Sequence, residues 1–355
     1  MCLQLFHDHQ VVARQATRGL CSDAVKRLIR LIAACSHGYN EFRWLNPMKL
    51  ATASLKRIAV PCTFLLATLV AARASAEEYL KSYTVTGPPT VRIKVDDSSV
   101  RVVTSDANQV DFRVTSEGFA AIKIGGKLRI DSRQNGNEVD LTVRLSPQVT
   151  LFFNTKRLST EVRMPKNADL QLETSDGRVE LSNLNGNIVV HTSDGAVEAS
   201  QLSGSIDIGT KDGDITADKL TGAFKLHSGD GKISGAALDG KCDVSTRDGS
   251  IHVAGRFDSL DLKSGNGPVT ARAEPGSKIS STWSIATKDG SVTVEIPKTL
   301  QVNLDARTGD GRISLGIPIS VEGDLGKKAL HGAINGGGPT LLIHTGDGSI
   351  HLNGI

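Results

Sequence analysis

The chain repeats itself every 18 residues over much of its length, and this period limits its fold more than any other feature. An Asp-Gly or Asn-Gly pair recurs at a constant spacing of 18, at positions 176–177, 194–195, 212–213, 230–231, 248–249 and 266–267. Further copies lie at 289–290, 310–311 and 347–348, at the looser intervals of 23, 21 and 37, the last being close to two repeats. A fixed period of this length is typical of architectures in which one structural unit stacks on the next.

Each repeat is predicted to contain two short strands and two turns. Asp-Gly is a strong turn signal, because Gly accepts positive φ and the Asx side chain bonds to nearby backbone. A second turn is indicated by Leu-x-Gly, which begins at Leu184, Leu202, Leu220 and Leu238. Between the turns, polar positions alternate with apolar columns such as Val179, Val197, Ile215, Ile233, Ile251 and Val269. This alternation predicts strands that bury one face and expose the other.

These units predict an all-β fold, a single-stranded parallel β-helix or solenoid with 18-residue coils. One coil cannot bury its own apolar face, but stacked coils join their faces into a continuous core. The low aromatic content of 4% and the 36 Gly residues also suit short strands and tight turns. An antiparallel β-sandwich is the alternative, because Asp-Gly also favours hairpin loops. The constant period favours stacked coils.

The N-terminal part has the pattern of an export signal. Lys49, Lys56 and Arg57 precede an apolar run at 58–72, which ends in Ala-Ser-Ala at 74–76. A basic region, an apolar region of this length and an A-x-A site are typical of a signal peptide, here with cleavage between Ala76 and Glu77. The run is shorter than the roughly 20 residues of a membrane-spanning helix. We therefore expect an exported protein, periplasmic, secreted or at the cell surface, with no stable membrane span after signal removal.

The chain is accordingly divided into four segments. Residues 1–47 are interpreted as an N-terminal extension from a misassigned start codon, and residues 48–76 as the signal peptide. Residues 77–170 contain alternating stretches without the strict repeat, and we expect a β cap or degenerate coils there, which would shield the strand edges at the end of a solenoid. Residues 171–355 are predicted to form the solenoid repeats.

The charge of the mature part limits the kinds of molecule it can bind, and its cysteine content excludes an intrachain disulfide there. Residues 1–76 hold 10 of the 41 Lys and Arg and 3 of the 38 Asp and Glu, which leaves 31 basic against 35 acidic residues, a net charge near −4. Such a balance gives no electrostatic footprint for nucleic acid or for an anionic membrane surface. Four of the five cysteines also lie before residue 77, so Cys242 has no intrachain disulfide partner in the mature part. Its column, shared with Ile188, Ile206, Phe224 and Leu260, predicts a buried thiol.

Three short stretches outside the turns are distinctive: Met-Pro-Lys-Asn-Ala-Asp-Leu at 164–170, Ile-Pro-Lys at 296–298 and Asn-Gly-Gly-Gly at 335–338. With the repeats, they resemble a bacterial family of exported β-strand-repeat proteins with adhesin-like domains of unknown function. The match covers roughly residues 85–353. The resemblance implies a right-handed parallel β-helix and export. It implies no catalytic residue.

The column of turn aspartates is the sharpest candidate for a site. Stacked coils would place Asp176, Asp194, Asp212, Asp230 and Asp248 about 5 Å apart, where calcium ions can bridge carboxylates. The simpler interpretation, which we favour, is that each Asp stabilises its own turn. The neighbouring hydroxyl column of Thr174, Thr192, Thr210, Ser228, Thr246 and Ser264 is likewise interpreted as turn caps, with a ligand-binding ladder as the alternative.

No other residue set indicates chemistry. His191 and His227 share one column, but Gly209 and Ser245 interrupt it, which favours solvated surface histidines. The acidic residues are spread at repeat spacing and are not clustered as an enzyme cleft requires. We therefore expect no catalytic residue, cofactor or resident metal.

The resulting functional hypothesis is an exported, non-catalytic solenoid, adhesin-like or structural, whose ligand the sequence does not identify. Possible partners are a component of the cell envelope or surface, or further copies of the chain. A self-assembling envelope-stress scaffold and, with less support, a polysaccharide-acting β-helix enzyme are the alternatives.

Overall fold

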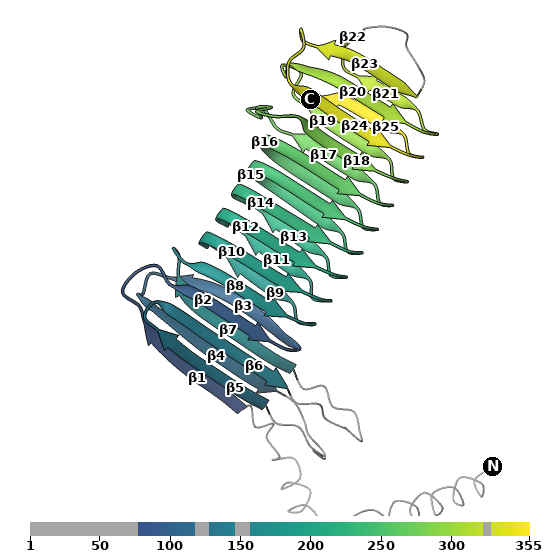
Figure 1. Cartoon of the computed structure of the whole chain (residues 1–355). Coiled ribbons are helices and arrows are strands. Elements are labelled where there is room, and N and C mark those ends of the chain that lie inside the picture. The colour runs from purple at the N-terminus through teal and green to yellow at the C-terminus, as the bar shows by residue number, and fades with distance from the viewer. Residues whose placement is uncertain (1–76, 118–127, 146–156, 322–327) are drawn as a thin grey trace, which may run out of the picture. The chain divides into compact units, whose positions relative to one another are not determined.

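The computed structural model describes residues 77–117, 128–145, 157–321 and 328–355. In these ranges the regular structure consists of 25 strands in one hydrogen-bonded sheet (Figure 1). The prediction of an all-β, solenoid-like protein is confirmed. The expectations for residues 1–47 and 48–76, including cleavage after Ala76, lie outside the described residues. Within the described ranges, no helix has the length and apolar character of a membrane span.

The central strands stack in two series, each of which pairs in parallel. The first series comprises β8 (Asp169–Thr174), β10 (Asn185–Thr192), β12 (Ser203–Thr210) and β14 (Thr221–Ser228). The second comprises β9 (Val179–Ser182), β11 (Val197–Ser200) and β13 (Ile215–Asp218). Two long strands, β15 (Ile233–Thr246) and β16 (Ile251–Ser264), run through both series. Partners such as Ile188 and Ile206 in the first series, or Val197 and Ile215 in the second, are one sequence repeat apart. The antiparallel alternative does not describe these strands.

The N-terminal end combines parallel and antiparallel strands and departs from sequence order. Its strands are β1 (Glu77–Thr84), β2 (Thr90–Val95), β3 (Ser98–Ser105), β4 (Gln109–Glu117), β5 (Leu128–Asn135), β6 (Glu138–Leu145) and β7 (Arg157–Pro165). The β2/β3 coil lies between the β6/β7 strands and the β8/β9 coil, in parallel with both. Antiparallel pairs of β5 with β6, β4 with β7 and β1 with β4 complete this end.

The C-terminal end shows the same kind of insertion. Its strands are β17 (Val269–Ala273), β18 (Trp283–Thr287), β19 (Val292–Ile296), β20 (Val302–Thr308), β21 (Ile313–Gly316), β22 (Ser320–Val321), β23 (Ala329–Ile334), β24 (Thr340–Thr345) and β25 (Ile350–Gly354). The β24/β25 coil lies between the β18/β19 and β20/β21 coils. The interval of 37 before the last Asp-Gly pair therefore does not represent two further coils. It contains the antiparallel strands β22 and β23 and the return of the chain into the stack.

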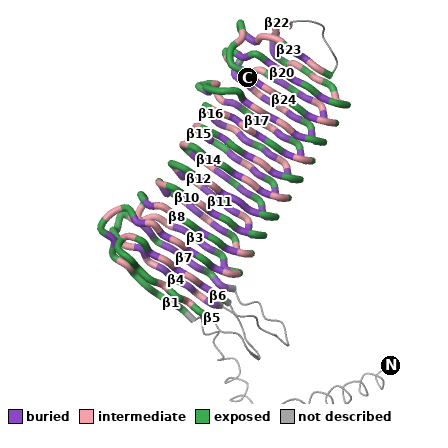
Figure 2. The backbone as a smooth tube through the Cα atoms, viewed as in Figure 1, coloured by how far each residue is buried: buried purple, intermediate pink, exposed green. Residues whose placement is uncertain are grey.

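The core is one continuous apolar cluster between the two series, as the alternating buried positions in Figure 2 show. The column of Val179, Val197, Ile215, Ile233, Ile251 and Val269 is at most 1% exposed. Cys242 pairs with Phe224 and Leu260 and is 2% exposed, which confirms the predicted buried thiol. Burial raises the pKa of this thiol well above its usual value, so it stays protonated and behaves as a small hydrophobe.

Hydroxyl side chains hold each Asp-Gly turn to the coil before it. Oγ1 of Thr192 accepts a hydrogen bond from the backbone N–H of Gly195 at 3.1 Å and donates one to the carbonyl of Ser175 at 3.0 Å. Equivalent bonds are made by the hydroxyls of Thr210, Ser228, Thr246 and Ser264, and these residues are 4–8% exposed. A buried hydroxyl that is used in this way is not available to a ligand. The interpretation of this column as turn caps is therefore confirmed for Thr192 and the four later members, but it is wrong for Thr174, whose hydroxyl makes no hydrogen bond.

Candidate functional site

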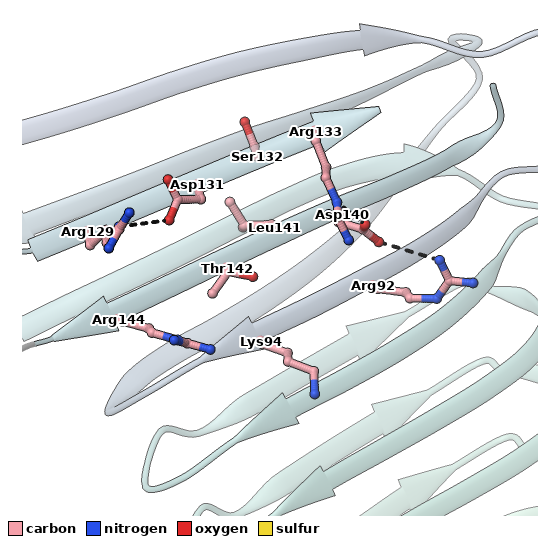
Figure 3. Close-up of a pocket in the computed structure, with 10 residues that line it drawn as sticks. All are labelled: Arg92, Lys94, Arg129, Asp131, Ser132, Arg133, Asp140, Leu141, Thr142 and Arg144. Atoms are coloured by element: carbon pink, nitrogen blue, oxygen red, sulfur yellow. Dashed lines mark hydrogen bonds and ion pairs between the residues drawn. The ribbon is translucent and has the colours of Figure 1, made fainter. Parts of the chain in front are cut away.

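A surface hollow lies on the outer face of β2, β5 and β6, at the N-terminal end of the first series. It encloses about 670 Å³. Figure 3 shows the lining residues, which are Arg92, Lys94, Arg129, Asp131, Ser132, Arg133, Asp140, Leu141, Thr142 and Arg144. Five of these side chains are cationic and two are carboxylates, so the lining carries a net charge of +3. We call this set the basic hollow.

Strand register brings the cations together. Residues that alternate along β2 and β6 point to the outer face, because the intervening residues fill the core, whereas on β5 the intervening Leu128 and Ile130 are only partly buried against it. The antiparallel pairing of β5 with β6 sets Arg129 directly opposite Arg144. The parallel pairing of β2 with β6 sets Arg92 opposite Asp140 and Lys94 opposite Thr142. Like charges directly opposite each other destabilise a sheet. The placement of Arg129 opposite Arg144 therefore does not serve the stability of the sheet.

One part of the hollow is neutralised by its own carboxylates. Arg133 contacts Asp140 at 2.7 Å, and Arg92 contacts Asp140 at 3.5 Å and Glu138 at 2.9 Å. The hydrogen bond from Arg92, together with its charge, lowers the pKa of Glu138 below its usual value. This part of the hollow is a closed ion-pair network.

The other part of the hollow keeps one cation without an ion pair among the described residues. Arg129 contacts Asp131 at 3.1 Å, and Lys94 contacts Glu173 at 2.7 Å, in both cases between exposed side chains. Arg144 makes no ion pair with any described residue. A guanidinium with five donors in a planar fork is suited to phosphate or carboxylate groups. Lys94 and Arg144 thus provide donors for an anionic group.

A smaller hollow of about 240 Å³ adjoins these two cations. Lys94 and Arg144 line it together with Val95, Asp96, Glu173, Thr174 and Ser175. Thr174 is 8% exposed, yet its hydroxyl makes no hydrogen bond, unlike the capping hydroxyls of the following coils. A buried hydroxyl without a partner is costly unless another group satisfies it. The smaller hollow therefore sets two cations, two carboxylates and one hydroxyl without a hydrogen-bond partner beside the basic hollow.

The turn aspartates lie along one edge of the stack, where lysine and arginine accompany several of them. Asp212 contacts Lys211 at 3.7 Å, and Arg247 contacts both Asp230 and Asp248. Among the residues that the structure describes, no group of three or more His, Cys, Asp or Glu side chains has metal-binding geometry. For Asp176, Asp194, Asp212, Asp230 and Asp248, turn stabilisation stays the prediction and calcium binding stays its alternative.

Asp176 differs from the other aspartates of this column, because acidic groups surround it. Desolvation and the charges of Asp97 and Asp194 raise the pKa of Asp176 above its usual value. A raised pKa in the folded state means that ionised Asp176 destabilises the fold at neutral pH, and that this effect vanishes below the ordinary pKa of an aspartate. We expect Asp176→Asn to raise the melting temperature at pH 7 and to leave it unchanged near pH 3. Asp212→Asn, next to Lys211, is the matched control. A lower melting temperature for Asp176→Asn at pH 7 would contradict this account.

Sequence reasoning did not find the basic hollow. The alternating cations in segments 92–94, 129–133 and 144 are visible in the sequence. Their convergence depends on the pairing of β5 with β6 and of β2 with β6, which lies outside the strict repeat. The insertion of β2 between β6 and β8 has no local sequence signal.

The fold defines a class of protein, an all-β chain with a long solenoid-like sheet of repeated strands. Residues 90–353 match the family model described as Toastrack DUF4097, and the chain belongs to this family. The predicted relationship to an adhesin-like family of unknown function is thereby confirmed. No curated protein matches the chain.

Several solved structures are similar over most of the chain, but only distantly. A candidate adhesin from Bacteroides fragilis is 10% identical, with 78% of this chain and 97% of that chain covered and a TM-score of 0.34. A candidate lipid-binding protein from Parabacteroides distasonis is 10% identical over 79% and 98% of the two chains, with a TM-score of 0.34. A candidate cell adhesion protein from Clostridium sporogenes is 14% identical over 79% and 100%, with a TM-score of 0.20.

Proposed function

We propose that this chain is an exported, non-catalytic binding module that holds an anionic component of the cell envelope or surface in the basic hollow. The guanidinium of Arg144 carries the proposal, because it lacks an ion-pair partner among the described residues and lies opposite Arg129 on the paired strand. Such an arrangement costs stability in the free protein. It gains favourable contacts when an anion is bound.

The proposed architecture and location support this role. We propose that residues 48–76 act as a cleaved signal peptide, preceded by an extension at 1–47, and that the mature chain has a β cap at 77–170 and a solenoid at 171–355. The solenoid is proposed to be a right-handed parallel β-helix with 18-residue coils. Export would bring the hollow to the periplasm or cell surface, where lipid headgroups and anionic polysaccharides carry phosphate and carboxylate groups.

Charge reversal in the hollow tests this function. We expect the purified protein to bind phosphatidylcholine vesicles that contain phosphatidylglycerol, and soluble polyphosphate. The double variant Lys94→Glu/Arg144→Glu should bind at least about tenfold more weakly, because two exposed ion-pair contacts at about 1 kcal/mol each are lost. Cosedimentation measures vesicle binding, and isothermal titration calorimetry measures polyphosphate binding.

A charge-matched control separates the hollow from general electrostatics. Lys225→Glu/Lys241→Glu changes the net charge equally, on the first series and away from the hollow. Equal loss in both double variants, or no binding of either probe by the unmodified protein, would overturn the proposal. Light scattering on the same samples tests the self-assembling alternative, since that role requires particles larger than one chain.

A further inference from the structure

A pair of histidines lies on the outer face of the first series, away from the basic hollow. His191 on β10 and His227 on β14 occupy the same register position, and Gly209 on β12 lies between them. The sequence suggests that Gly209 interrupts this column. The structure shows instead that Gly209 makes room, because a Cβ at this position would lie 2.1 Å from Cε1 of His227. The imidazole of His227 fills the space that Gly209 leaves.

The two imidazoles approach each other across this glycine. Their ring centroids are 6.1 Å apart, and the planes are tilted by 59°. With metal–nitrogen bonds of about 2.0–2.1 Å, two imidazoles on one tetrahedral ion have centroids about 5 Å apart. The observed separation therefore differs from a shared-ion geometry by about 1 Å, which half-exposed side chains can cover by small rotations.

The surroundings favour a neutral imidazole that lacks a hydrogen-bond partner. Nδ1 of His227 and Oδ1 of Asp207 lie 4.0 Å apart, and both atoms are shielded from solvent without a hydrogen bond. Burial, partly offset by the charge of Asp207, lowers the pKa of His227. A neutral imidazole is the form that binds metal ions. Histidines that bind metals commonly donate their other N–H to a carboxylate, which fixes the ring orientation.

We propose that His191 and His227 bind one divalent transition-metal ion, Zn²⁺ or Cu²⁺, through their Nε2 atoms, and that Asp207 orients His227 through Nδ1. Imidazole nitrogen suits both ions. Water completes the coordination, because the described residues offer no ready group of three protein ligands. Asp207 is a positioning residue in this site. The proposal is independent of anion binding in the basic hollow.

Isothermal titration calorimetry tests this site. ZnCl₂ or CuCl₂ alone is titrated into full-length protein that has been treated with a chelator, at pH 7.5. We expect a binding step of one ion per chain, which His191→Asn and His227→Asn each remove. Asp207→Asn should weaken binding by about 10- to 100-fold, as is usual for a carboxylate that orients a ligand. Because every other His and Cys of the chain is retained in each variant, the lost step reports this pair.

Two further variants distinguish a built site from scattered surface histidines. Gly209→Ala retains both imidazoles but places a methyl group where the ring of His227 lies, so the binding step should also be lost. His344→Asn, on the same face but beyond β18, is the matched control and should bind normally. Circular dichroism verifies that each variant is folded. A step that persists in the His191→Asn/His227→Asn double variant, or the absence of any step in the unmodified protein, would overturn the proposal.

Discussion

A Gly231→Ala variant is expected to lose about 3 kcal/mol or more of unfolding free energy, although it adds a single methyl group. A Cβ at Gly231 would lie 1.9 Å from the carbonyl oxygen of Gly213, in the turn of the preceding coil. No rotamer change relieves a clash with backbone, so the coils must separate locally. Overpacking costs typically about 1–3 kcal/mol even where side chains can adjust. The turn also loses alignment of the hydrogen bond from Gly231 N–H to Ser228 Oγ, now 2.9 Å long.

Urea unfolding followed by circular dichroism measures this loss. Gly87→Ala is the matched control, because a Cβ there meets only the Asn137 side chain, at 3.3 Å. It should change the unfolding free energy by less than about 1 kcal/mol. Similar midpoints for the two variants would show that the turns are less tightly stacked than described.

Replacement of Trp283 by alanine should cost about 3–5 kcal/mol, as is typical of a large aromatic side chain removed from a core. Trp283 is 0% exposed and is among the largest fully buried side chains. It packs edge-on against Phe257 with ring centroids 6.3 Å apart, where the strictly periodic coils give way to the C-terminal end. The cavity opens between β16 and β24, which flank β18 on either side.

Trp283→Phe separates packing from the polar atom of the indole. Nε1 of Trp283 is buried without a hydrogen-bond partner, which is unfavourable in the native protein. Phenylalanine retains most of the apolar surface and removes this N–H, so its cost should be well below that of alanine. Thermal and chemical denaturation of both variants measure the difference. Equal losses for Phe and Ala would mean that the indole makes contacts other than apolar packing.

The repeated strands of the middle could be predicted from the sequence because their structure is local. Each Asp-Gly turn, each hydroxyl cap and each alternating strand is specified within one repeat, and the next repeat supplies the partner at the same register. The buried state of Cys242 followed directly from its column. Such features can be predicted because the same physical solution occurs in every unit.

The ends and the candidate sites could not be predicted in this way. The places of β2 and β24 in the stack depend on pairing between segments that are far apart in sequence, and they use the same alternating pattern as any other strand. The cations of the basic hollow come together only through the pairing of β5 and β2 with β6. Prediction of the histidine pair would require the side-chain orientation of His227, which the aligned repeats do not give.

At each end of the stack one coil is inserted between two others, and this limits the order in which the strands can pair during synthesis. Residues 302–308 leave the ribosome before residues 340–345, yet the later segment lies between the earlier one and β18. The stack therefore cannot grow one layer per translated repeat at this end, and β20 reaches its place only when β24 is present. At the other end, β2 is synthesised long before β8, beside which it lies. The stack is completed at each end only when segments distant in sequence pair, which is slower than local strand pairing. The middle of the stack has no such requirement, so whole repeats can be gained or lost there during evolution while the strand pairing at both ends is preserved.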